Sequence, residues 1–157
     1  MRISGESRLL VTASIPAKPE RVVFRLESCD QGWADENPID GPYAGSYTWI
    51  EAFIYRPDED ATDAPAPQGD WEAGFRLMKY PEVWVIQRNK RADSQYRSYE
   101  IVWTKDTDFG WDPMVGRGSG RGFVQTLRPG DRIGILACAQ YAGWVNYIKC
   151  AEVEVVF

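Results

Sequence analysis

Histidine is absent from this chain of 157 residues, and cysteine occurs only 3 times. Without histidine the most common general base of enzymes is missing, and a zinc site would need thiolates together with a carboxylate. Cys29, Cys138 and Cys150 form no Cys-x-x-Cys pair, and their odd number suits free thiols in a reducing compartment. We therefore expect no metal, no cofactor and a cytoplasmic protein.

The sequence also lacks an apolar run near the length of a membrane span, which takes about 20 residues. Segment 1–8 has no apolar core of the kind found in signal peptides. Basic residues do not predominate either, because the net charge is −5. Nucleic acids and anionic membranes both attract basic surfaces. We expect neither a nucleic acid nor a membrane as partner.

Aromatic residues, in contrast, are abundant, with 7 Trp, 8 Tyr and 6 Phe. Aromatic side chains favour β-strands and also provide flat surfaces for ligands. Segments in which apolar and polar residues alternate, or that are rich in β-branched and aromatic residues, are predicted to be strands. These predicted strands span 9–13, 21–28, 46–56, 82–89, 97–105, 123–127, 132–139 and 145–157.

The predicted strands indicate an all-β fold, because no amphipathic helix of useful length accompanies them. We expect a single domain over 1–157, an antiparallel β-sandwich of jelly-roll type with about eight strands. The alternative is a closed β-barrel. Segments 82–89 and 97–105 are expected to pair as a hairpin, and 57–70 to form an acidic loop rich in proline and alanine. Segment 71–80 fits either a strand or a helical turn.

Two similar segments each follow a predicted strand at a point where the chain must turn. The first corner, 28–33, reads Ser-Cys-Asp-Gln-Gly-Trp, and the second corner, 138–144, reads Cys-Ala-Gln-Tyr-Ala-Gly-Trp. Both contain glutamine and end in Gly-Trp. We expect the two corners to lie side by side at one edge of the sandwich, with their polar side chains converging.

The composition of this edge suits a small polar ligand such as a glycan. A carboxylate beside an amide can bond to vicinal hydroxyls, and an indole ring offers a face on which a sugar stacks. The candidate ligand-binding residues are Asp30, Gln31, Trp33, Trp49, Asn89, Gln140, Trp144 and Asn146. Each also has a structural interpretation, in which the carboxylate and amides bond to loop backbone and the indoles close the end of the core.

Charged residues nearby suggest further roles. Arg91 and Arg97 are expected at the tip of the hairpin, where an arginine can grip a carboxylate or phosphate with two hydrogen bonds, or be a solvated surface charge. Glu51 and Asp30 are weak catalytic candidates, because paired carboxylates can act as acid and base. Glu51 falls on the aromatic face of the strand 46–56, where burial raises a carboxyl pKa.

Three functions fit these features. The first is a small-ligand binding module, lectin-like, that binds a glycan at the strand-end edge. The second is a small histidine-free enzyme, a cyclase, isomerase or hydrolase of a natural product, which would need an enclosed apolar pocket. The third is a protein-interaction domain, which would expose a broad apolar patch. The lack of histidine favours a protein that is not an enzyme.

The corners also carry a family resemblance. The Ser-x-Asp-Gln-Gly-Trp motif at 28–33, the Gly-Pro-Tyr-Ala-Gly-Ser-Tyr-Thr-Trp segment at 41–49 and the Gly-Trp-Val-Asn segment at 143–146 resemble a family of fungal β-sandwich domains. That resemblance implies a fold similar to galactose-binding-like jelly rolls. Cys29 and Tyr47 depart from the family pattern, which often has histidine and tryptophan at these positions.

Overall fold

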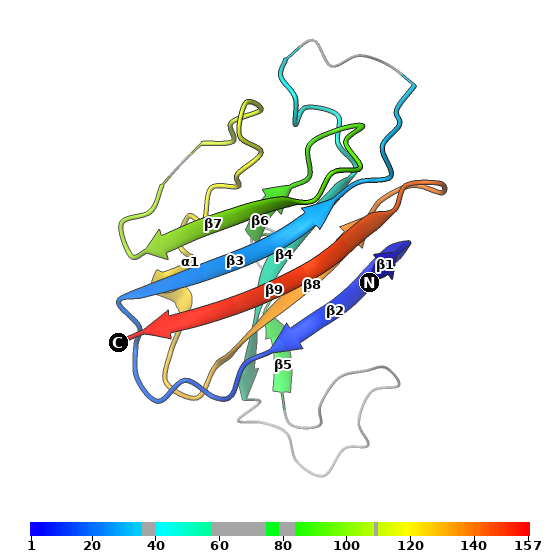
Figure 1. Ribbon diagram of the computed structural model, residues 1–157. Helices are drawn as coiled ribbons and strands as arrows, with labels where there is room; N and C mark the ends of the chain where they lie inside the picture. Colours follow the sequence, from blue (N-terminus) through cyan, green and yellow to red (C-terminus); the bar gives the residue numbers. More distant parts are fainter. Residues whose placement is uncertain (36–39, 58–74, 79–83, 109) are drawn as a thin grey trace.

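The computed structural model describes residues 1–35, 40–57, 75–78, 84–108 and 110–157. Its elements are β1 (Arg2–Ile3), β2 (Gly5–Val11), β3 (Arg21–Cys29), β4 (Thr48–Pro57), β5 (Phe75–Met78), β6 (Trp84–Arg88), β7 (Arg97–Thr104), α1 (Phe123–Thr126), β8 (Arg132–Ala139) and β9 (Asn146–Val156). The strands form two antiparallel sheets that pack face to face (Figure 1).

One sheet has the strand order β1-β9-β3-β7, and the other has the order β2-β8-β4-β5, with β6 also paired to β4. The predicted all-β sandwich is therefore confirmed. Within the described ranges the sheets stay separate, so the alternative of a closed barrel is not the observed architecture.

The core lies between the sheets and is built from the inward faces of alternating strands. On β4, Ile50 and Ile54 belong to the core cluster, whereas Phe53 lies on the opposite face and is buried there. Its ring lies against Gly134 of β8, where a side chain would collide with it. Both faces of β4 are thus covered, as expected for a central strand.

The predicted hairpin of 82–89 with 97–105 is wrong. β6 pairs with β4 in one sheet, and β7 pairs with β3 in the other. The connection between them crosses the end of the sandwich instead of turning back. Each strand finds a better partner in its own sheet, where its apolar face meets the core.

A second correction concerns 123–127, which was expected to be a strand. The segment forms the short helix α1, and Phe123 and Val124 are completely buried. The Phe123 ring packs edge-on against Trp84 and Trp103, with centroids 5.1 Å and 5.0 Å away. A helical turn places these neighbouring apolar residues into one gap, which a strand would direct to opposite faces.

The remaining differences lie at strand ends. The first strand was predicted at 9–13, but β2 spans Gly5–Val11 and follows the short β1, so the strand begins and ends earlier than predicted. β5 makes part of 71–80 a strand. The acidic loop predicted at 57–70 lies outside the described residues, apart from Pro57 at the end of β4.

A buried polar network joins the two sheets at one end of the core. Asn89 lies directly after β6, and its Nδ2 donates to Thr48 Oγ1 at 3.0 Å and to Asn146 Oδ1 at 2.9 Å. Asn89 Oδ1 accepts a hydrogen bond from Ser28 Oγ at 2.6 Å. All four residues are fully buried. Buried polar groups must be paired, so this network fixes the relative position of the strands that it joins.

We expect Asn89→Ala to lower the free energy of unfolding by about 1–3 kcal/mol, because it leaves buried partners unpaired. Urea unfolding followed by tryptophan fluorescence measures the change. Gln125→Ala is the control, since this exposed amide bonds only to Lys105 O, and it should change stability by less than about 0.5 kcal/mol. Equal stability of the two variants would contradict the role given to the network.

Candidate functional site

The two corners lie side by side, as the sequence predicted. Gln31 of the first corner accepts a hydrogen bond at its Oε1 from the backbone N–H of Val145, 3.0 Å away and just after the second corner. Its Nε2 donates to Trp33 O at 2.9 Å. The ring centroids of Trp33 and Trp144 are 6.4 Å apart. One glutamine therefore holds both Gly-Trp turns together.

Aromatic rings from three loops form a cluster at this end, which we call the aromatic ridge: Trp33, Tyr47, Tyr141 and Trp144. The Tyr47 ring meets Tyr141 and Trp144 edge-on, with centroids at 4.7 Å and 5.1 Å. Trp33 and Tyr141 are about half exposed, at 51% and 50%. Such mutual edge-to-face packing restrains the rings while leaving their outer surfaces open to solvent.

Asp30 lies beneath the ridge and is fully buried. Its carboxylate accepts backbone N–H groups from Gly32 at 2.7 Å, Ala92 at 2.7 Å and Asp93 at 3.0 Å. It therefore ties the first corner to the connection between β6 and β7. In this arrangement Asp30 supports the loops and does not face solvent.

The polar side chains of the corners, which the sequence analysis expected to converge, do not form a shared pocket from Asp30, Gln140 and Asn146. Asn146 is fully buried, and its Nδ2 donates to Trp49 O and Cys138 O at 2.9 Å and 3.1 Å. Gln140 is exposed and bonds to the Tyr141 hydroxyl at 3.2 Å. The buried amides Asn89 and Asn146 are thus part of the scaffold, whereas the aromatic residues reach the surface.

An arginine that the sequence analysis did not select lies beside the ridge. The pairing of β4 with β6 places Arg88 opposite Trp49, and its guanidinium lies 5.3 Å from the Trp49 ring. The Trp111 ring lies 5.2 Å from the same guanidinium. Nη1 of Arg88 donates to Ser46 O at 2.8 Å. Burial lowers the pKa of Arg88, although an arginine stays charged at neutral pH.

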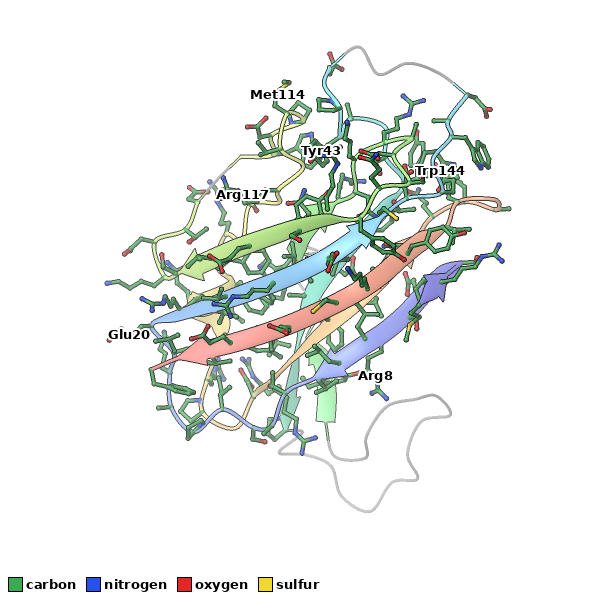
Figure 2. The ribbon with its side chains drawn as sticks, viewed as in Figure 1. Arg8, Glu20, Tyr43, Met114, Arg117 and Trp144 are labelled. Carbon is green, nitrogen blue, oxygen red and sulfur yellow. The ribbon has the colours of Figure 1, made fainter. Side chains whose placement is uncertain are left out.

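The position of Trp111 follows from how its loop runs beside β6. Arg88 N donates to Gly116 O at 2.8 Å, and Gly118 lies so close to Val85 O that a side chain there would collide with it. The N–H of Tyr43 donates to Pro113 O at 3.1 Å, which joins this loop to the one before β4. Figure 2 shows Tyr43 beside the loop that carries Met114.

An open groove of about 710 Å³ lies between these loops, and we call it the Arg88 groove. Its walls include Asp40, Ser46, Tyr47, Arg88 and Trp111. Trp49, predicted from the sequence as a ligand contact, forms the inner stacking partner of the arginine. The groove thus combines a positive charge with indole surfaces, a pattern typical of sites for ligands that carry an anion.

A second open groove of about 310 Å³, the Arg91 groove, lies on the other side of Tyr47. Asp35, Arg91 and Trp144 line it, and both grooves share Gly45 and Tyr47. Gly45 has a φ of 63°, and Arg91 Nη1 lies 3.3 Å from the place where a Cβ on this glycine would be. Within the part of the chain that the structure describes, the buried Nε of Arg91 has no hydrogen-bond partner.

Little in this region resembles catalytic machinery. The Glu51 carboxylate is buried and accepts the Trp49 indole N–H at 2.9 Å, so it orients that ring. Burial raises the pKa of the buried Cys29 thiol, which disfavours a thiolate. Over the described ranges no cluster of acidic and cysteine side chains is arranged to hold a metal ion, and no helix is long and apolar enough to cross a membrane.

No protein-family model matches this chain, and no solved structure matches it either. Its function must therefore be argued from the site. The sequence predicted Trp33, Trp49 and Trp144 at one end, but it gave no sign of Arg88 or Tyr47. Arg88 could be found only from its pairing with Trp49 across strands β4 and β6, which the folded chain provides.

We expect Asp30→Ala to lower the free energy of unfolding by about 1–3 kcal/mol, because backbone N–H groups lose their acceptor. Urea unfolding measures the loss. Asp106→Ala, a change at an exposed aspartate far from the corners, is the control and should change stability by less than about 0.5 kcal/mol. If Asp30→Ala is as stable as the wild type, the hydrogen bonds of Asp30 to the loop backbone are not needed for stability.

Asp30 also predicts a pH dependence. Burial raises the pKa of its carboxyl, and the Asp93 charge adds to this, while the N–H donors only partly offset the rise. The folded protein then holds the proton more tightly than the unfolded chain. The stability contributed by Asp30 is therefore greatest below the unfolded pKa of about 3.9 and falls as the pH rises through the folded value.

In Asp30→Asn this pH-dependent loss disappears, so stability should decline less than in the wild type as the pH rises above the unfolded pKa of about 3.9. Urea unfolding at a series of pH values gives the two slopes, and Asp106→Asn should keep the wild-type slope. Parallel curves for wild type and Asp30→Asn would refute the expectation.

Proposed function

We propose that this protein is a small-ligand binding module with lectin-like glycan binding at the edge formed by the two corners. The aromatic ridge supplies ring faces for sugars, and the grooves on either side of Tyr47 supply polar groups. Sugars are commonly bound in this way, by stacking on aromatic rings and by hydrogen bonds from a few polar side chains.

The observation that carries the proposal is the half exposure of Trp33 on a corner held by the hydrogen bonds of Asp30 and Gln31. A half-exposed tryptophan adds little buried apolar surface to the core. Its loop is nevertheless held in place by Asp30 and Gln31. Ligand contacts are often displayed in this manner, on loops that a rigid scaffold positions. The buried polar residues of the edge then serve to support the binding surface.

The form of the grooves favours binding over the enzyme alternative. A cyclase, isomerase or hydrolase of a natural product would need an enclosed pocket, whereas both grooves are open to solvent. An open groove beside exposed rings suits part of a longer chain, such as an oligosaccharide. Binding through a few rings and hydrogen bonds is expected to be weak for a single site.

We also propose that the β-sandwich is a jelly roll. The strand orders β1-β9-β3-β7 and β2-β8-β4-β5 support a jelly roll, because successive strands alternate between the two sheets except for β4, β5 and β6, which share one sheet. The motif at 28–33 supports the resemblance to fungal domains of galactose-binding-like fold. Fold similarity alone does not assign a ligand, so the proposal depends on the ridge.

We expect Trp33→Ala and Trp144→Ala each to weaken glycan binding about tenfold or more, because each removes a ring face from the ridge. Binding to a panel of immobilised neutral and acidic glycans gives the ligand, and titration calorimetry gives the affinity. Phe157→Ala is the matched control, since this ring is also 51% exposed but lies at the chain end, at the other end of its sheet (Figure 1). Failure to bind any glycan, or equal binding by all variants, would contradict the proposal.

A further inference from the structure

The arginines of the site differ from the other cations of the same connection. After β6, Lys90 and Arg97 both pair with Asp93, at 3.4 Å and 2.6 Å. Among the described residues no carboxylate forms an ion pair with Arg88 or Arg91. In a chain of net charge −5, two partly buried arginines without an acidic partner need an explanation.

The two grooves also repeat the same pair of residue types. The Arg88 groove sets a guanidinium against Trp49 and Trp111, and the Arg91 groove contains a guanidinium and Trp144. Tyr47 stands between them and lines both. A cation and at least one indole therefore lie on each side of a shared tyrosine, as a ligand with a repeated ring and charge would require.

We infer that the ligand of this edge is an acidic oligosaccharide, with a carboxylate or sulfate group on one sugar held by Arg88 and another on a neighbouring sugar held by Arg91. The inference rests on the proposed glycan binding and names its chemical class. Arginine binds carboxylate and sulfate oxygens through paired N–H groups, and such charge-assisted hydrogen bonds are about twice as strong as neutral ones.

The geometry of Arg88 suits this role. Indole rings lie close to its guanidinium, and Nη1 is anchored on Ser46 O, so the side chain is held in place before a ligand arrives. The Arg88 side chain is half-buried and lines the groove, where a ligand can reach it. A preorganised donor loses little conformational freedom on binding.

Arg91 adds a second argument. Its Nε is buried and has no hydrogen-bond partner among the described residues, which is costly for a charged group. An oxyanion in the Arg91 groove would neutralise this guanidinium. Asp35 and Asp40 line the two grooves without an ion pair to either arginine, and their carboxylates can accept hydrogen bonds from sugar hydroxyls.

The test compares a tetrasaccharide of galacturonic acid with its carboxyl-reduced, neutral form and with a sulfated galactan tetrasaccharide that carries no carboxylate, by titration calorimetry. We expect each acidic ligand, or one of the two, to bind at least about tenfold more tightly than the neutral form, and added salt to reduce the difference. The carboxylated and sulfated ligands identify which anion is preferred.

Arg88→Gln and Arg91→Gln should each lower affinity for the acidic ligand about tenfold to a hundredfold, and so remove most of its advantage over the neutral ligand. Arg88→Lys keeps the charge but loses the paired N–H groups, so an intermediate affinity is expected. Arg21→Gln is the matched control, since it removes the same charge at the start of β3, at the opposite end of the sandwich. Circular dichroism and thermal unfolding establish that each variant folds, and Arg91→Gln keeps the test valid if the loss of the Ser46 contact unfolds Arg88→Gln.

Equal affinity for acidic and neutral tetrasaccharides, unchanged in the arginine variants, would overturn the inference while leaving glycan binding intact. If no glycan binds, the proposed function fails. Titration with sodium sulfate and sodium acetate, followed by tryptophan fluorescence, then decides on the arginines separately. A fluorescence change on adding the anion that Arg88→Gln abolishes would support the anion site. If the anions cause no fluorescence change, the anion site is contradicted along with glycan binding.

Discussion

The hydrogen bond between the side-chain amides of Asn89 and Asn146 joins the two sheets at the end where the binding loops leave the sandwich. Asn89 follows β6 in one sheet, and Asn146 begins β9 in the other. Ser28 and Thr48 complete the pairing in a fully buried place. Buried amides tolerate few arrangements, because each unpaired group costs free energy. The starting points of the neighbouring loops are therefore fixed.

Polar residues at this end divide into those that support loops and those that face solvent. Asp30 and Gln31 use their oxygens on backbone N–H groups, and they hold the two corners together. The rings of the ridge and the arginines of the grooves, in contrast, are exposed or half-buried and reach solvent. A site of this kind needs both groups, since a ring or a cation that moves freely binds weakly.

The polar residue that the sequence marked as the leading candidate for a ligand contact has a structural role. Asp30 has the features of a ligand contact, yet it is fully buried and bonded to backbone. Arg88 looked like an ordinary strand residue, yet its guanidinium lies close to two indoles and pairs with no carboxylate among the described residues. Sequence spacing predicts which residues are close along the chain, whereas exposure and charge pairing depend on what folds against them.

The sequence by itself determined the β-sandwich, the two faces of β4 and the meeting of the two Gly-Trp corners. Alternation with a period of two is a local property, and it directs side chains to one face or the other before any partner strand arrives. Only the tertiary structure decided that β6 and β7 lie in different sheets, that Phe123 sits on a helical turn, and that Arg88 pairs with Trp49. Those outcomes depend on contacts between segments far apart in the chain, where packing and register outweigh local preference.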